Sequence, residues 1–178
     1  MRGSKDAESG QLIIYTGQGK GKTTAALGLA FRAMGRQKKV GMVQFLKGKW
    51  MTGERIFARD LALLELYVMG EGFSWESEDL SRDKQAAQRA WEKSKELIAA
   101  PDVPIIILDE ISYAINYDFI SESDVLQFIQ NRPKAKHVVL TGRHIPDSLI
   151  QVADLVTEMQ AIKHPFSKGQ RAVLALDY

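Results

Sequence analysis

The chain has 178 residues, of which 45% are hydrophobic and 26% charged, so we expect a flexible tail over residues 1–10 and one soluble globular domain over residues 11–178. The formal net charge of +2 is too small to indicate nucleic acid as a partner, and the absence of cysteine excludes disulfides and thiolate chemistry. The lack of cysteine fits a cytoplasmic protein, and since no apolar run approaches membrane-spanning length we expect no membrane partner.

The first predicted elements are a strand, a glycine-rich turn and a helix. The apolar run Leu12–Thr16 precedes the helical pattern Lys22–Met34. Glycines let backbone N–H groups converge on an anion, and a helix N-terminus adds its positive dipole end. We therefore predict nucleotide phosphate binding, with Lys22 reaching a phosphate oxygen and Thr23 coordinating Mg2+. The predicted nucleotide-binding residues are Gly17, Gln18, Gly19, Lys20, Gly21, Lys22, Thr23 and Thr24.

This octet is shorter than the usual phosphate-binding loop. In the usual pattern four residues separate the first glycine from the Gly-Lys-Ser/Thr end. Here only three residues separate Gly17 from Gly21, and one of them is an additional lysine, Lys20. A chance surface turn rich in Gly and Lys is the alternative, which the flanking strand and helix disfavour.

Further strands and helices alternate along the rest of the chain. Because the strand-like runs lack polar alternation, they are typical of parallel strands covered on both faces. The alternation predicts right-handed crossovers and an α/β three-layer sandwich with a mostly parallel sheet, in which ligands bind at the carboxyl ends of the strands. We expect strands at Val40–Phe45, Leu63–Val68, Ile105–Leu108, Val138–Thr141 and Leu155–Met159, and helices at Ser81–Ala99, from Ser121 toward Pro133 and from Pro146 to about Val152.

Charged residues follow two of these strands. Asp109 and Glu110 end an apolar strand, where paired acids suit a cation, although such acids also cap helices. Beside a phosphate loop we favour a metal site formed by Thr23, Glu110 and Asp109. Arg143 follows another strand and would clamp phosphate oxygens, against the alternative of a solvated surface arginine.

Three further features leave more than one interpretation open. Phe73 and Trp75 lie in a glycine-containing stretch without helical or strand periodicity, so they either cover a flat ligand or fill the core. Arg32 belongs to a basic cluster at a helix end, which is usually a solvated face. His164 has no spacing to partners that would indicate catalysis or metal binding.

With these motifs placed, the chain resembles the P-loop family of corrinoid adenosyltransferases, the cob(I)alamin ATP:adenosyltransferases. The resemblance runs from Leu12 to Tyr178. Two departures are the segment 169–178, which follows the family pattern only in part, and an N-terminal arm shorter than that of longer members. The segments that carry the resemblance, in the family's order, are 17–26, 40–48, 52–54, 72–76, 108–113, 140–143, 153–159 and 163–166.

The resemblance implies a RecA-like P-loop fold and transfer of the 5′-deoxyadenosyl group of ATP to Co(I) of a reduced corrinoid, with release of inorganic triphosphate. ATP would bind in the reversed direction, with Lys22 stabilising the triphosphate, and no general base is needed. Phe73 and Trp75 would face the lower side of the corrinoid and keep its cobalt four-coordinate, and Arg32 would lie near it. The implied partners are ATP, a corrinoid, an electron-donating reductase and a second copy of the chain in a homodimer.

Two other functions are compatible with a phosphate loop. One is a phosphotransferase or ATPase that cleaves at the γ-phosphate, which the short loop and the lack of a hydrolytic base disfavour. The other is a nucleotide-binding or corrinoid-binding protein without catalysis, which the combination of Lys22, Thr23 and Glu110 disfavours.

Overall fold

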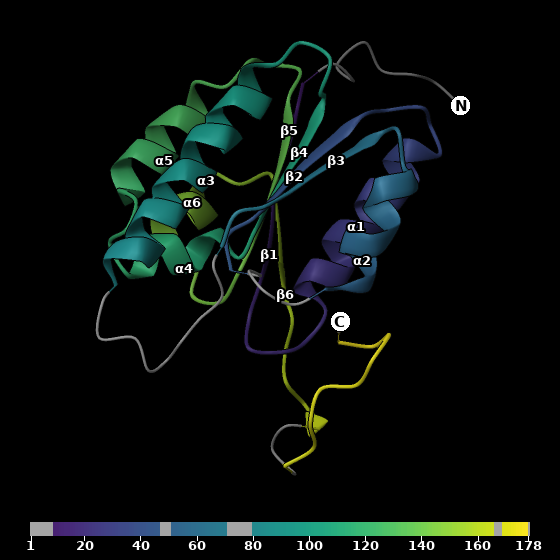
Figure 1. Cartoon of the computed structure of the whole chain (residues 1–178). Helices are drawn as coiled ribbons and strands as arrows, with labels where there is room; N and C mark the ends of the chain where they lie inside the picture. Colours follow the sequence, from purple (N-terminus) through teal and green to yellow (C-terminus); the bar gives the residue numbers. More distant parts are fainter. Residues whose placement is uncertain (1–8, 47–50, 71–79, 166–168, 178) are drawn as a thin grey trace.

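A parallel six-stranded sheet forms the centre of the protein (Figure 1). The computed structural model describes residues 9–46, 51–70, 80–165 and 169–177. The strand order is β3-β2-β4-β5-β1-β6, and every neighbouring pair is parallel, which confirms the predicted sheet. The strands are β1 (Leu12–Thr16), β2 (Val40–Gln44), β3 (Leu64–Val68), β4 (Ile105–Asp109), β5 (His137–Thr141) and β6 (Leu155–Glu158).

Helices cover both faces of this sheet and so complete three layers. Figure 1 shows α1 (Lys22–Met34) and α2 (Gly53–Phe57) on one face. The opposite face carries the remaining helices, and a short 3-10 turn (Ala58–Asp60) follows α2. These remaining helices are α3 (Ser81–Ala99), α4 (Ile111–Asn116), α5 (Glu122–Gln130) and α6 (Asp147–Gln151). The α/β three-layer architecture is therefore the one that the sequence predicted.

Alternate strand residues supply two separate cores. Ile13, Ile107 and Val139 pack with the small side chains of α1, among them Ala26 and Ala30. Their neighbours along the same strands point to the other face and pack against α3 to α6. Because successive side chains of a strand point to opposite faces, an uninterrupted apolar run is what a sheet buried on both faces requires.

The edge strand β6 differs from this pattern. All four of its residues are exposed, among them Leu155 and Val156, although we expected each strand to be covered on both faces. β6 pairs only with β1, at the end of the sheet order, so it has one strand neighbour instead of two. Its apolar sequence predicted the strand correctly and its burial incorrectly.

The helices agree with the sequence in most positions. α1 and α3 have the predicted bounds, and Ser121 caps α5 by accepting a hydrogen bond from the Asp124 N–H over 3.3 Å. Pro146 is the N-cap of α6 rather than a residue of its first turn. The short helices α2 and α4 were not predicted, because five or six residues are too few to show helical periodicity.

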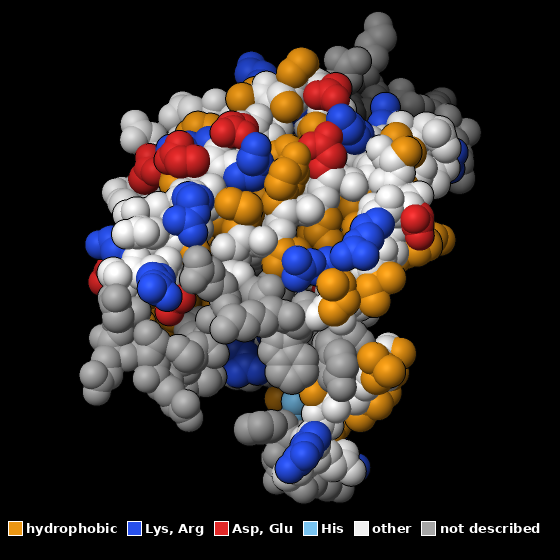
Figure 2. All heavy atoms as spheres, in the orientation of Figure 1, with side chains coloured by type: hydrophobic (Ala, Val, Ile, Leu, Met, Phe, Trp, Pro, Cys, Tyr) orange, Lys and Arg blue, Asp and Glu red, His pale blue; other side chains and the backbone are white. Residues whose placement is uncertain are grey.

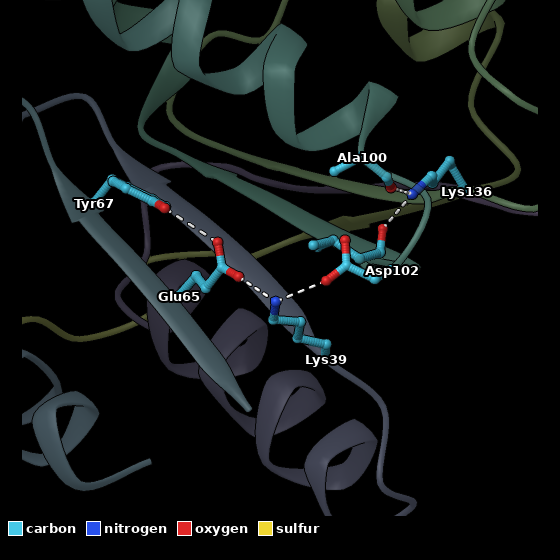
Figure 3. Close-up of polar contacts among 7 residues, drawn as sticks. Lys39, Glu65, Tyr67, Ala100, Asp102 and Lys136 are labelled. Carbon is cyan, nitrogen blue, oxygen red and sulfur yellow. Dashed lines mark hydrogen bonds and ion pairs between the residues drawn. The ribbon is translucent and has the colours of Figure 1, made fainter. Parts of the chain in front are cut away.

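A network of charges ties the amino ends of several strands together (Figure 3). Lys39, just before β2, pairs with Glu65 of β3 and with Asp102, which follows α3, over 2.5 and 2.8 Å. Nearby, the buried ammonium of Lys136 donates to the carbonyl oxygens of Ala100 and Val103. This network lies at the end of the sheet opposite to the predicted site. Among the described helices, none is long and apolar enough to cross a membrane.

Candidate active site

The loop between β1 and α1 packs directly against the chain that leaves β6. The Gly19 N–H donates to the Met159 carbonyl over 2.6 Å. A Cβ atom on Gly19 would lie 2.7 Å from the backbone of Gln160, and one on Gly17 would lie 2.5 Å from Met159 O. Gly17 also has a φ of 97°, which disfavours other residues. The short loop therefore needs glycine both for its conformation and for this close backbone contact.

Lys22, the first residue of α1, is buried inside this loop. Its ammonium donates to the carbonyl oxygens of Gly17 and Gly19 over 2.8 and 3.0 Å, and the residue is 6% exposed. Burial lowers the pKa of Lys22 below its ordinary value, and the nearby carboxylate of Glu110 acts in the opposite direction. The loop thus wraps a desolvated cation, which interacts more strongly with an anion than a solvated one does.

The carboxylate of Asp109 is held by three side-chain donors. Its Oδ1 accepts hydrogen bonds from the hydroxyls of Thr23, over 2.9 Å, and Thr141, over 2.7 Å. Its Oδ2 accepts from the amide of Gln44 over 3.1 Å. The donors come from α1, β5 and β2, so the strand order β2-β4-β5-β1 brings them around β4. This set fixes the rotamer of a carboxylate that is only 1% exposed.

Glu110 follows Asp109 at the point where β4 passes into α4. Its φ of 59° is left-handed, which is uncommon for a residue other than glycine. Its N–H donates to the hydroxyl of Thr141 over 2.9 Å, and this contact supports the turn. The turn directs Glu110 to a cavity, whereas Asp109 stays among its donors.

A cavity of about 490 Å3 lies in front of the loop. It collects most residues of the predicted phosphate site, together with Arg143 and Glu110, while the loop residues Gly17 and Gln18 lie outside its lining. The amide of Gln18 instead contacts the ring of His144 over 2.9 Å. The described lining comprises Gly19, Lys20, Gly21, Lys22, Thr23, Thr24, Leu27, Gly53, Glu54, Glu110, Arg143, His164, Ala175, Leu176 and Asp177.

Arg143 reaches this cavity from a tight turn after β5. Gly142 has a φ of 148°, and a Cβ atom there would lie 2.0 Å from the Ser112 hydroxyl. The turn therefore packs against α4 without room for a side chain. Because the chain turns at Gly142 directly after β5, the next residue, Arg143, lies at the cavity and does not continue along the sheet.

The C-terminal segment also borders the cavity. Lys20 donates to the Leu176 carbonyl over 2.7 Å and pairs with the carboxylate of Asp177. The Lys20 ammonium lowers the pKa of Asp177, and Asp177 also accepts from the Val173 N–H over 2.7 Å. Figure 2 shows hydrophobic side chains gathered on this segment, where Val173, Leu174 and Leu176 are exposed.

The described lining of this cavity contains none of the three predicted corrinoid residues. Phe73 and Trp75 lie outside the residues that the structure describes. Arg32 is an exposed residue in the last turn of α1, about 15 Å along the helix axis from Lys22 by the rise of an α-helix. It is absent from the described lining of the cavity. Arg32 and the loop therefore lie at opposite ends of one helix.

Sequence reasoning missed several polar residues of the site. Gln44 and Thr141 each end an apolar strand, and Glu54 lies in the first turn of α2 at the cavity. A polar residue that closes an apolar strand on the loop side of the sheet was the available signal. His164, which had no catalytic spacing in the sequence, also lines the cavity.

The side chains fit Mg2+ better than a tightly coordinated transition metal. The described residues contain no group of three or more His, Cys, Asp or Glu that would hold an ion by themselves. Mg2+ instead binds through one or two protein oxygens together with substrate phosphates and water. Because Thr23 donates its hydrogen to Asp109, its oxygen lone pairs stay available to a cation, and Glu110 lines the same cavity.

Fold and site together define a class of protein. A parallel α/β sheet with a glycine loop between β1 and the first helix, opposite an acidic strand end, is the P-loop type of nucleotide-binding architecture. The flagellar accessory protein FlaH of Methanocaldococcus jannaschii has a similar fold. The match has a TM-score of 0.55 at 15% identity and covers 85% of this chain and 71% of that one. This likeness concerns the fold alone.

The sequence comparisons define the family. The model of the family "ATP:corrinoid adenosyltransferase BtuR/CobO/CobP" matches residues 8–178, and the chain belongs to this family. A corrinoid adenosyltransferase of a Sinorhizobium species is 44% identical, and the match covers 98% of this chain and 83% of the relative. The corrinoid adenosyltransferase of Escherichia coli K12 is 39% identical over 96% of this chain and 87% of its own. Family membership confirms the resemblance noted in the sequence.

Proposed function

We propose that this protein transfers the 5′-deoxyadenosyl group of ATP to the Co(I) centre of a reduced corrinoid and releases inorganic triphosphate, as a step in making or salvaging adenosylcobalamin. The observation that carries the proposal is the shared cavity of Lys22, Thr23 and Glu110 in a chain of the ATP:corrinoid adenosyltransferase family. Phosphate chemistry alone is compatible with many enzymes. The family match directs the proposal to adenosyl transfer.

The proposed step is a nucleophilic substitution at carbon. Co(I) supplies an electron pair to C5′ of the ribose, the Co–C bond forms, and the C5′–O bond breaks. The bonding pair of that C–O bond leaves with the triphosphate, and cobalt is formally oxidised to Co(III). No proton is transferred in this step, so the protein needs to orient two substrates and stabilise a highly charged leaving group.

The cavity supplies groups suited to this leaving group. Lys22 and Arg143 would bind triphosphate oxygens, and Lys20 would add a third cation if it leaves Asp177. Thr23 and Glu110 would hold Mg2+, with Asp109 acting behind Thr23 through its hydrogen bond. When bound, Mg2+ would neutralise charge on the triphosphate. Amides of Gly21 and Thr23 would add donors, whereas the Gly19 N–H already donates to Met159.

The corrinoid side of the site rests on the resemblance. We infer that Phe73 and Trp75 face the lower side of the corrinoid and that Arg32 contacts it. Since Arg32 is exposed and remote from the loop, this role requires the corrinoid or a second copy of the chain to extend over α1. With cob(II)alamin and ATP, Trp75→Ala should suppress the spectrum of four-coordinate cobalt while ATP affinity stays within twofold. A parent-like spectrum would contradict the assignment of Trp75.

A direct assay tests the proposed activity. The protein is incubated with ATP, Mg2+ and chemically reduced cob(I)alamin, and in parallel with reduced cobinamide. A light-sensitive Co–C product together with triphosphate supports the proposal, and the two acceptors show which corrinoid is preferred. Formation of ADP and phosphate without a Co–C product would instead support γ-phosphate chemistry.

We further infer a cytoplasmic homodimer that receives its electron from a separate reductase. The exposed apolar residues of β6 and α1, such as Leu155 and Phe31, offer surface for self-association. Sedimentation velocity over a range of concentrations tests the dimer. Replacing the chemical reductant by candidate flavoprotein reductases in the same assay tests the electron donor.

A further inference from the structure

The side chain of Gln44 joins two acidic residues at the carboxyl end of the sheet. It is 1% exposed, at the last position of β2, beside Asp109 in the strand register. Its amide nitrogen lies 3.1 Å from Asp109 Oδ2 and 3.4 Å from Glu54 Oε1. The two hydrogens of one NH2 group can therefore serve two carboxylates that belong to different elements, β4 and α2.

Backbone hydrogen bonds to neighbouring segments hold the main chain of Gln44 in place. Its carbonyl oxygen accepts from the N–H groups of Met69 and Gly70 over 3.1 and 3.4 Å. Its neighbour Phe45 donates to the Asp109 carbonyl over 3.0 Å. The main chain at this strand end is thus hydrogen-bonded to the residues that follow β3 on one side and to β4 on the other.

The amide oxygen of Gln44, Oε1, is buried and has no hydrogen-bond partner within the described part of the chain. A buried, unpaired acceptor costs free energy, and an apolar side chain of the same length would avoid that cost. Gln44 therefore stabilises the fold less than its burial suggests. Stability alone does not explain why a glutamine occupies this buried position.

The contact of Gln44 with Glu54 indicates a role in ligand binding, because Glu54 lines the phosphate cavity. Asp109 is surrounded by three donors and is not among the described lining residues of the cavity. The acidic side chains of that lining are Glu54, Glu110 and Asp177, and Asp177 is paired with Lys20. Carboxylates close to a triphosphate repel it unless a cation lies between them. The orientation of Glu54 then matters for nucleotide binding in the presence of a divalent cation.

We propose that Gln44 is a positioning residue that holds Asp109 and Glu54 in one arrangement and so makes α2 part of the Mg2+–ATP site. This proposal rests on the proposed function for the identity of the ligand. Gln44 acts through the two carboxylates and is not a catalytic residue. Its loss should weaken binding of ATP with Mg2+ and leave binding of ATP without the metal almost unchanged.

The test measures ATP affinity of the full-length chain by calorimetry, once with Mg2+ and once with EDTA. Gln44→Met keeps the length of the side chain and removes both donors, and Glu54→Gln removes the carboxylate at the cavity. Each should weaken Mg2+–ATP binding by about tenfold and change metal-free binding by less than about twofold. The double variant should be little weaker than either single variant, because the two residues act as a unit.

Ser94→Ala is the matched control. Ser94 is fully buried on α3 and donates to the Ala90 carbonyl, so its loss perturbs the interior without touching the site. It should leave both affinities unchanged. Melting temperatures are recorded for every variant. If Gln44→Met does not fold, Glu54→Gln still tests the metal-dependent part of the prediction, since Glu54 is only half-buried.

Three results would overturn the proposal. They are equal losses of affinity with and without Mg2+, additive effects in the double variant, and an unchanged affinity in Glu54→Gln. Failure of the proposed function appears differently, because the parent would then bind ATP without forming a Co–C product. The ATP affinities of the variants with and without Mg2+ can still be compared in that case.

Discussion

The Thr23 hydroxyl donates to Asp109 Oδ1 over 2.9 Å, and this contact joins residues 86 positions apart in the chain. It connects the first turn of α1 to the end of β4 across the intervening strand β5. Thr141 of β5 donates to the same oxygen over 2.7 Å. The phosphate loop and the acidic strand end are therefore one hydrogen-bonded unit.

The first prediction concerns Thr141, which connects Asp109 with the Glu110 backbone. Thr141→Val should lower the free energy of unfolding by about 1–3 kcal/mol, because it leaves a buried carboxylate oxygen and the Glu110 N–H short of a partner. Urea unfolding measures the change. Thr157→Val, on the exposed strand β6, is the control and should stay within about 0.5 kcal/mol. Equal effects of the two variants would show that the Asp109 contacts add no stability.

The second prediction concerns the pH dependence of ATP binding through Lys22. Its pKa lies below the ordinary 10.5 because of burial, so the ammonium loses its proton at lower pH than a solvated lysine does. ATP affinity should fall as pH rises through this lowered pKa. Lys22→Met should bind ATP at least about tenfold more weakly at neutral pH, because a charge-assisted contact is lost, and should lack this alkaline fall.

Calorimetric titrations from neutral pH to pH 10 check this expectation. The sign for stability is opposite to that for binding. A buried cation with a lowered pKa destabilises the fold while it is charged, so this penalty diminishes as pH rises through the folded pKa. An ATP affinity of the parent that stays flat to pH 10 would contradict the prediction.

The third prediction concerns the pair of Lys20 and Asp177. A triphosphate has to compete with the Asp177 carboxylate for the Lys20 ammonium. Asp177→Asn should therefore tighten ATP binding, by only about two- to fivefold because the pair is largely solvated. Increasing salt should reduce the difference. Weaker binding in Asp177→Asn would show that the C-terminal segment helps to hold the nucleotide.

The fourth prediction concerns the network of Lys39 (Figure 3). The Lys39 ammonium holds the pKa of Glu65 and of Asp102 below their ordinary values of 4.5 and 3.8. A carboxyl group with a lowered folded pKa adds stability above its unfolded pKa and loses it as pH falls through the folded one. Acid unfolding should therefore remove this contribution below about pH 4.5.

Lys39→Met tests this by removing the cation and keeping the length of the stem. Its free energy of unfolding should decrease at neutral pH and should depend less on pH between about pH 5 and pH 3 than that of the parent. Lys95→Met, on α3, gives a comparison in which the lost ammonium pairs with Glu92 within one helix and also lies 5.8 Å from the Trp91 ring centroid. Parallel pH profiles of parent and Lys39→Met would contradict the role of the network.

The sequence by itself determined the order of elements, the sheet type and the phosphate loop. Uninterrupted apolar runs such as Ile105–Leu108 indicate burial on both faces, and glycines indicate a turn that other residues cannot adopt. The bounds of α1 and α3 also followed from periodicity. These are local properties, so they can be recognised without knowing the partners of each residue.

Only the tertiary structure decided which side chains meet at the strand ends. Gln44, Thr141 and Glu54 join the site because the strand order brings β2, β5 and α2 around β4, and no local pattern encodes that order. The exposure of β6 and the contact of Lys20 with Asp177 have the same origin. Contacts between residues far apart in the chain depend on the packing of the whole sheet, so they were decided by the fold.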